Sequence, residues 1–124
     1  MNASASWLAV AGTILLTVYG QFIIKWRMSG VRLAPDSRIW AKAAIILGMF
    51  GDPWIWSAIL AAFGASVCWM AAMTRLSLSQ AYPFTSLTIV LVTVIGMAVL
   101  GEAATLSRLA GIGIVILGLI ILAR

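Results

Sequence analysis

Residues 7–26 read WLAVAGTILLTVYGQFIIKW, a stretch apolar enough to cross a membrane, with Trp7 and Trp26 at its ends. As a helix it covers about 28 Å at roughly 1.5 Å per residue, close to the thickness of a bilayer's hydrocarbon core. Four polar side chains follow one another in it at a spacing of four residues: Thr13, Thr17, Gln21 and Lys25. That spacing keeps them on one helix face. Because a polar line is costly against lipid, this face is predicted to turn toward protein or a water-filled cavity.

The composition is that of an integral membrane protein. Of the 124 residues, 64% are hydrophobic and 9% are charged, whereas soluble chains carry roughly 25% charged residues. A membrane span must satisfy its backbone polar groups internally, and the alternating pattern of barrel strands is not seen, so we predict an all-α membrane protein. The N-terminus lacks the basic region of a secretory signal, so the first helix is expected to be retained.

Metal, cofactor and nucleic-acid binding are not expected. The single cysteine, Cys68, lies in a predicted span, and the sequence contains no histidine, which leaves no internal disulfide and no metal constellation. The formal net charge is +5. The basic residues flank the membrane segments, so the expected partners are membrane lipids with anionic headgroups, and not nucleic acid.

Four transmembrane helices are predicted in a single domain, residues 1–124. They cover about residues 5–27, 54–76, 83–100 and 106–123. Pro83 is expected in the first turn of the third span, where its missing N–H is tolerated. Residues 38–50, between the first two spans, are apolar but too short to span. A short interfacial helix is favoured here over an extension of the second span or an irregular loop.

Positive charge is distributed unevenly between the two sides of the predicted bundle. The side of the first and third connections holds Lys25, Arg27, Arg32, Arg38, Lys42 and Arg108. The opposite side holds Arg75, Arg124 and the free amine. The positive-inside rule therefore places the basic loops in the cytoplasm and both termini outside.

The last predicted span is almost wholly apolar and contains several glycines. Gly111 and Gly118 are two helical turns apart, so they share a face. This face either packs within the monomer or forms a seam between two subunits. Four short helices enclose little space, so a transport path of this size is expected to need a second copy or a partner.

The acidic residues give little basis for catalysis. They are Asp36, Asp52 and Glu102, all predicted near the membrane interfaces, and no nucleophile–base pair accompanies them. The chain is therefore not expected to be an enzyme. Transport or lipid handling remains.

Lys25 and Glu102 are predicted at a similar depth on the basic side, so they can pair with each other. Alternatively, Lys25 and Arg27 present cations to a phosphate at the headgroup level. Lys25 can also simply snorkel to the interface, and Glu102 can be a helix-terminal charge bonded to Arg108 or Lys25.

Two further polar residues have two interpretations each. The amide of Gln21 lies deep in the stripe and must be bonded, either across helices or to a substrate. Tyr82, at the opposite end of the membrane, either lines an exit or anchors its helix at the interface, and the anchor is favoured.

Three segments together resemble the small multidrug resistance branch of the EamA-like drug/metabolite transporter superfamily. They are YGQFIIK at 19–25, LSLSQAYPFTSL at 76–87 and LGEAATLSRLAGIGIVILG at 100–118. Within that superfamily the chain is most similar to the four-helix subunits of the flippase for 4-amino-4-deoxyarabinose-phosphoundecaprenol. The resemblance covers essentially the whole chain and implies a homodimer or heterodimer joined through the last helix, with Gly111 and Gly118 at the seam.

The resemblance also shows a departure. Drug exporters of this family carry a membrane-embedded glutamate in the first helix, and alignment on Lys25 puts Thr17 near that position. A threonine neither changes charge at physiological pH nor attracts a cation, so proton-coupled drug export is disfavoured. A basic cavity edge suits an anionic polyprenyl phosphate sugar better.

We therefore consider three functions. The preferred one is a subunit of a bacterial inner-membrane flippase that moves an undecaprenyl phosphate-linked sugar from the cytoplasmic to the periplasmic leaflet. Lys25 and Arg27 would meet the phosphate, and Thr17 and Gln21 would offer hydrogen bonds to the headgroup, with Glu102 and Tyr82 as further candidate binding residues. The alternatives are a small multidrug or metabolite exporter and a non-transporting accessory subunit.

Overall fold

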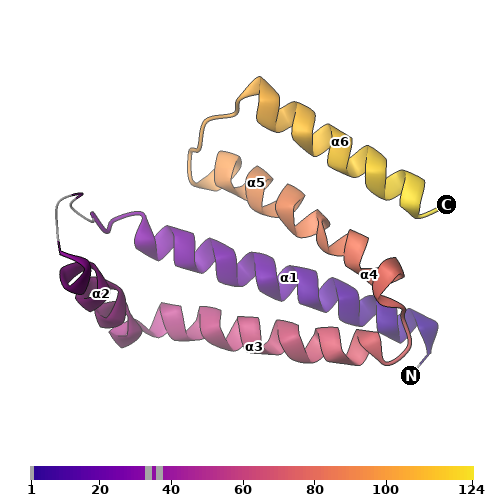
Figure 1. Ribbon diagram of the computed structural model, residues 1–124, viewed down its shortest axis with the longest axis horizontal. Helices are drawn as coiled ribbons and strands as arrows, with labels where there is room; N and C mark the ends of the chain where they lie inside the picture. Colours follow the sequence, from indigo (N-terminus) through magenta and orange to yellow (C-terminus); the bar gives the residue numbers. More distant parts are fainter. Residues whose placement is uncertain (1, 33–34, 36–37) are drawn as a thin grey trace.

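The computed structural model describes residues 2–32, 35 and 38–124, and every regular element in these ranges is a helix. The elements are α1 (Ala3–Met28), α2 (Ile39–Gly48), the 3-10 turn η1 (Met49–Gly51), α3 (Pro53–Met73), α4 (Leu78–Thr85), α5 (Leu87–Val99) and α6 (Leu106–Leu122). The long helices run alternately up and down, so both termini lie at the same end (Figure 1). The acidic residue Asp36 lies outside the described residues.

Three helical segments among the described residues are long and apolar enough to cross a membrane: Ala3–Met28, Pro53–Met73 and Leu78–Val99. Two shorter apolar segments accompany them, Ile39–Gly51 and Leu106–Leu122. The predicted all-α architecture is thus confirmed for the described residues, with three helices that have the length and composition of spans. The segment predicted as the fourth span is a shorter helix of 17 residues.

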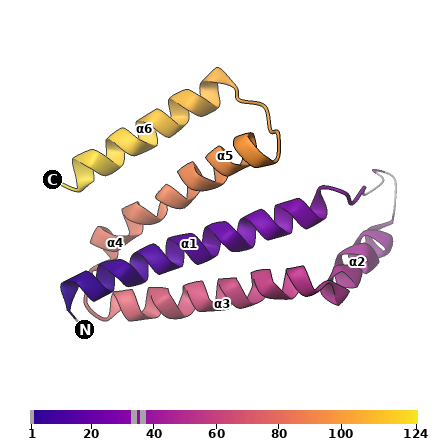
Figure 2. The same cartoon turned by 180° about the vertical axis from the view of Figure 1, so that it is seen from behind.

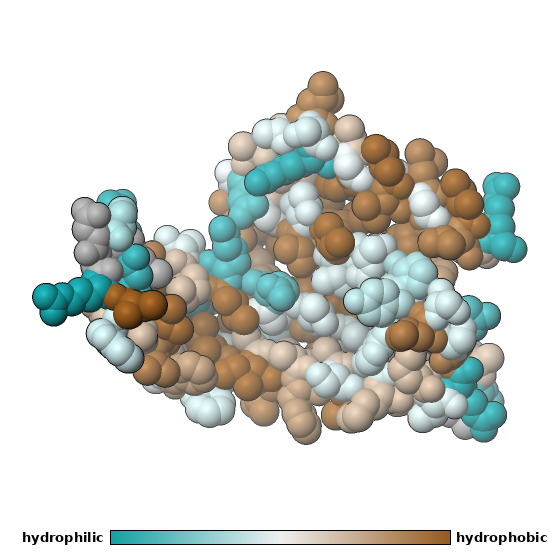
Figure 3. All heavy atoms as spheres, viewed as in Figure 1, coloured by the Kyte–Doolittle hydropathy of each residue, from teal (hydrophilic) through white to brown (hydrophobic). Residues whose placement is uncertain are grey.

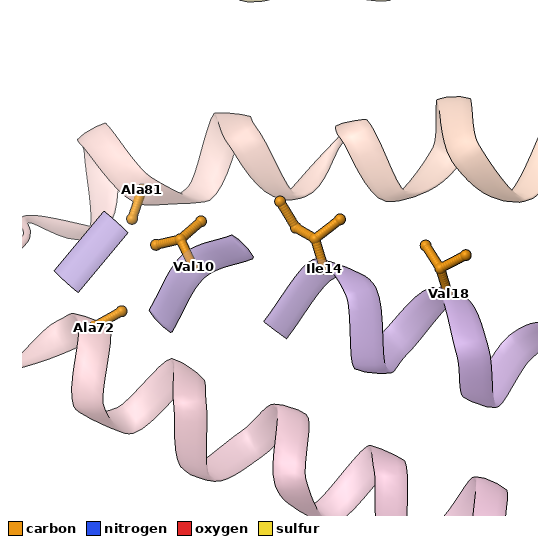
Figure 4. Close-up of a cluster of buried hydrophobic side chains, with 5 residues drawn as sticks. All are labelled: Val10, Ile14, Val18, Ala72 and Ala81. Carbon is orange, nitrogen blue, oxygen red and sulfur yellow. The ribbon is translucent and has the colours of Figure 1, made fainter. Parts of the chain in front are cut away.

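Helix α1 lies between α3 and the α4–α5 segment in both views (Figures 1 and 2). Its residues Val10, Ile14 and Val18 are buried and point toward α4 and α5, and Ala72 of α3 and Ala81 of α4 complete this core (Figure 4). Lipid tails are as apolar as these side chains, so close packing must hold membrane helices together. The spacing of four residues on α1 supplies that continuous packing face.

Small residues let α1 and α3 approach closely. The buried positions on α3 include Ala58, Ala61 and Ala65. Gly20 of α1 is buried as well, and a Cβ added there would lie 3.3 Å from the carbonyl oxygen of Ala58. Close backbone approach of this kind is how small residues join membrane helices.

The third span begins earlier than the sequence predicts. Helix α4 starts at Leu78, so Pro83 lies inside it and not in its first turn. The expectation for Pro83 was wrong because packing onto α1 draws residues 78–82 into the helix: Ala81 is fully buried, and Phe84 meets Trp7 edge-on at 5.0 Å. The missing N–H and the ring of a proline weaken a helix, and the α-helix is interrupted at Ser86, between α4 and α5.

The other bounds differ only slightly. Helix α1 is one or two residues longer at each end than the predicted 5–27, and α3 ends at Met73 instead of residue 76. The segment predicted at 38–50 is a ten-residue helix followed by a 3-10 turn, and α2 buries none of its residues.

Candidate functional site

A cavity of about 550 Å³ opens between α1, α5 and α6. Its walls are mostly apolar and include Phe22, Ile95 and Ile112. The polar side chains that line it are Gln21, Lys25, Thr93, Glu102 and Arg108. Figure 3 shows hydrophilic side chains gathered where α5 leads into α6, whereas the outer surface of α6 is mostly hydrophobic. The cavity therefore combines an apolar body with a charged end.

The end of α5 positions Glu102. Gly101 has a φ of +68°, the left-handed conformation that glycine adopts without strain and that commonly ends helices. The chain reverses there, and the Glu102 N–H donates to the carbonyl of Gly96 at 3.0 Å. The Glu102 side chain lies against the buried Gly96, where an added Cβ would be only 3.0 Å from Oε2. Two glycines thus fix the backbone and leave space for the carboxylate.

Glu102 forms ion pairs with two cations from different helices. Its Oε1 lies 3.2 Å from Nζ of Lys25, and its Oε2 lies 3.6 Å from Nη1 of Arg108. The Lys25 and Arg108 side chains are 58% and 49% exposed, against 33% for Glu102. Of the alternatives left open for Lys25 and Glu102, the structure shows the pair, and Arg108 joins it. Lys25, Glu102 and Arg108, the charged triad, have one positive charge in excess.

Helix α6 presents Arg108 to this triad from its first turn. Thr105 is the N-cap of α6, and its hydroxyl accepts a hydrogen bond from the Arg108 N–H at 3.4 Å. The guanidinium also donates to the carbonyl of Ala103 at 3.3 Å. The sequence assigned Arg108 only to membrane orientation or to pairing with Glu102. Its place six residues after Glu102, just past a helix cap, was the available signal that it lines the same cavity.

The polar stripe of α1 divides between two cavities. Thr13 and Thr17 line a second one, about 400 Å³, between α1 and α3. There the Thr13 hydroxyl lies 3.3 Å from the carbonyl oxygen of Ala65, as well as 3.0 Å from that of Ala9 on its own helix. Gln21 lines both cavities, whereas Lys25 lines only the larger one. The structure therefore places Gln21, Lys25 and Glu102 at one cavity and Thr17 at the second one, which it shares with Gln21.

Arg27 does not line the cavity. Its guanidinium pairs with the carboxylate of Asp52, which also caps α3 by accepting from the Trp54 N–H at 2.9 Å. The guanidinium lies 5.5 Å from the ring centre of Trp26, and that ring meets Trp54 edge-on at 5.7 Å. This arrangement ties the end of α1 to the start of α3.

The remaining candidate residues lie outside the charged triad. Tyr82, on α4, is 63% exposed and meets Trp69 edge-on at 6.2 Å. Gly111 lines the larger cavity. Within the described chain, no atom of another helix lies within 4 Å of a Cβ added at Gly111 or Gly118, so packing inside the monomer leaves space beside these two glycines. The described residues also contain no group of three His, Cys, Asp or Glu side chains that could hold a metal ion.

Comparison with known families shows the class of protein. A model of the EamA-like transporter family matches residues 2–124, and the chain belongs to that family. It is a multi-pass membrane transporter and not an enzyme. The resemblance predicted from the three segments is confirmed.

Comparison with individual proteins of known description adds detail to the family match. Over 127 residues the chain is 32% identical to a protein of Pseudomonas aeruginosa (strain LESB58) described as the probable 4-amino-4-deoxy-L-arabinose-phosphoundecaprenol flippase subunit ArnF. That match covers 97% of this chain and 85% of the relative. It is also 33% identical over 113 residues to the probable ArnE subunit of the same flippase in Pseudomonas paraeruginosa (strain DSM 24068 / PA7), covering 90% and 91%. No solved structure gives a significant match.

Proposed function

We propose that the chain is a subunit of a bacterial inner-membrane flippase that moves an undecaprenyl phosphate-linked sugar of the aminoarabinose type from the cytoplasmic to the periplasmic leaflet. The observation that carries this proposal is the charged triad at the end of an apolar cavity between α1, α5 and α6. The names of its ArnE and ArnF relatives support the class of substrate.

The proposed path carries only the headgroup. Moving an isoprenoid tail into water costs about 0.8 kcal/mol per CH₂, so the tail stays in lipid. The phosphate binds Lys25 and Arg108, and Gln21, one turn deeper on α1, offers its amide to the sugar hydroxyls. Arg108 takes the role predicted for Arg27, because Arg108 lines the cavity and Arg27 does not. Thr17 lies on the side of the second cavity, and we assign it no contact with the phosphate.

The proposed membrane arrangement has four spans. Helix α6 has 17 residues, or about 26 Å at 1.5 Å per residue, and no charged residue lies between Arg108 and Arg124. It crosses with modest thinning or snorkelling at its ends. Helix α2, which buries none of its residues, lies in the cytoplasmic interface.

The proposed functional unit is a dimer. The relatives are described as two kinds of subunit of one flippase, and α6 buries none of its residues in the monomer. We propose that the Gly111 and Gly118 face of α6 meets a second copy or a similar four-helix subunit.

Reconstitution tests the proposal through Lys25. The full chain, purified in mild detergent with any bound subunit, is placed in liposomes, and uptake of a radiolabelled, water-soluble short-chain prenyl phosphosugar is measured. Hydrogen bonds to charged groups contribute about 1.5–3 kcal/mol, so Lys25→Ala should lower uptake about tenfold or more. Lys42→Ala, on α2 and outside the cavity, is the matched control and should retain it.

Two results would contradict the proposal. Unchanged uptake by a correctly folded Lys25→Ala variant removes Lys25 from the path. The second result combines two observations: the wild type takes up no prenyl phosphosugar, and its expression makes a sensitive strain resistant to quaternary ammonium compounds. That result would favour the exporter instead.

A further inference from the structure

We propose that Glu102 is the residue that selects the headgroup: it accepts the ammonium of a zwitterionic headgroup while Lys25 and Arg108 hold the phosphate. This inference rests on the proposed function and deepens it. It assigns the three charges of the triad to two different groups of one substrate.

The starting observation is that a carboxylate lies at the centre of the proposed phosphate site. Its two oxygens face Nζ of Lys25 at 3.2 Å and Nη1 of Arg108 at 3.6 Å, the two cations available to the phosphate. A phosphate that reaches either cation therefore comes close to Glu102, and like charges at that distance repel. For a purely anionic headgroup the carboxylate only weakens binding.

Phosphate binding also removes the partners of Glu102. The carboxylate is 33% exposed and lines the cavity. When Lys25 and Arg108 turn to a phosphate, Glu102 is left as a partly buried charge with weakened pairing, which is unfavourable. An ammonium on the same headgroup supplies the missing cation, so a zwitterion leaves each of the three charges paired.

The backbone at Glu102 is restricted by its surroundings. The left-handed Gly101, the 3.0 Å bond from the Glu102 N–H to Gly96, and the contact of the carboxylate with Gly96 all restrict it. The longer Lys25 and Arg108 side chains are more exposed and belong to α1 and α6. A carboxylate placed between two longer, more exposed cations suits a ligand whose ammonium meets Glu102 while its phosphate meets Lys25 and Arg108.

The names of the relatives mention a lipid whose headgroup has this chemistry. It is a sugar with one amino group, linked to one phosphate. The neutral amide of Gln21 lies in the same cavity, one turn from Lys25, and is suited to the sugar hydroxyls between the two charged groups. The amine is thus the feature by which Glu102 would distinguish this lipid from other prenyl phosphosugars.

The test compares two short-chain prenyl phosphosugars that differ only in a 4-amino or a 4-hydroxyl group. Uptake is measured in liposomes holding the full chain with any subunit that remains bound. Since an ammonium–carboxylate hydrogen bond is among the stronger ones, the wild type should prefer the amino lipid about tenfold. Glu102→Gln should abolish that preference by lowering uptake of the amino lipid and maintaining or raising uptake of the hydroxyl lipid. Arg75→Gln, two residues beyond the end of α3 and outside the cavity, is the control.

The outcomes separate this inference from the proposed function. If Glu102→Gln changes uptake of both lipids equally, or of neither, Glu102 does not read the amine although the flippase proposal stands. If the wild type takes up neither lipid above empty liposomes, the flippase proposal itself fails. Should Glu102→Gln not fold, wild-type competition decides: phosphoethanolamine should inhibit uptake more strongly than glycerol phosphate, and equal inhibition would overturn the inference.

Discussion

At the scale of single residues, Gly96 controls where the carboxylate of Glu102 can lie. An added Cβ would lie 3.0 Å from Oε2 and would displace the end of a flexible side chain, not backbone. Gly96→Ala should therefore change the free energy of unfolding by less than about 1 kcal/mol, since alanine favours the helix. The preference for the amino lipid should fall about threefold to tenfold, as expected for weakening one charge-assisted hydrogen bond. Thermal unfolding and the two-lipid uptake assay measure these effects.

Gly113→Ala provides the matched control, because nothing lies within 4 Å of a Cβ at that position. It should change the free energy of unfolding only by the gain in helix propensity, and it should leave the lipid preference unchanged. If Gly96→Ala behaves like Gly113→Ala in the uptake assay, the position of the carboxylate is not what selects the lipid.

The same residues show how far sequence reasoning reaches at this scale. Equal predicted depth was enough to suggest the pair of Lys25 and Glu102, which the structure contains. Predicted depth did not reveal the partner of Arg27, which is Asp52, just before α3. A span predicted from hydropathy fixes depth in the membrane but not rotation about the helix axis, and rotation decides which cavity a side chain enters.

At the scale of elements, Asp52 has two separable roles at the start of α3. It caps the helix through the Trp54 N–H and pairs with Arg27. Asp52→Asn keeps a good capping residue and removes the charge, so the free energy of unfolding should fall by no more than about 1 kcal/mol. Asp52→Ala loses the cap as well and should lower it by about 1 kcal/mol further. Titration with a denaturing detergent measures the difference, and equal values for the two variants would contradict the capping role.

Helix α4 shows what hydropathy could not predict about an element. The sequence predicts a connection in the polar segment before Pro83, yet this segment forms a helix because Ala81 and Phe84 pack onto α1. By contrast, the end of α5 and the start of α6 were predictable, since Gly101 and the Thr105 cap are local signals. Local signals specified the helix ends here, and tertiary packing overrode them at α4.

At the scale of the whole molecule, the asymmetry of charge predicts the orientation. Lys25, Arg27 and Arg108 belong to one end of the bundle, and Arg124 to the other. Alkaline phosphatase fused after Arg124 should be active in the periplasm, and the same reporter inserted after Gly30 should be inactive. If only the reporter inserted after Gly30 is active, the chain has the opposite orientation. Activity of both reporters would indicate dual topology.

The arrangement of α1, α3 and the α4–α5 segment follows from patterns that the sequence displays, namely apolar length, a packing face at a spacing of four residues and small residues on α3. The place of α6 does not. Its apolar face is uniform, so nothing in its own residues distinguishes lipid, the monomer and a second subunit as its neighbour.

Native mass spectrometry of the full chain, released from mild detergent, tests the central claim that the cavity between α1, α5 and α6 holds a prenyl phosphosugar. The account predicts a dimer, with itself or with a similar subunit, that carries the mass of such a lipid, and a marked loss of that mass in the Lys25→Ala Arg108→Ala double variant. Two results would contradict this claim. One is a wild-type spectrum that shows no prenyl phosphosugar although the source membranes contain one, and the other is a lipid adduct that is equally abundant in the double variant.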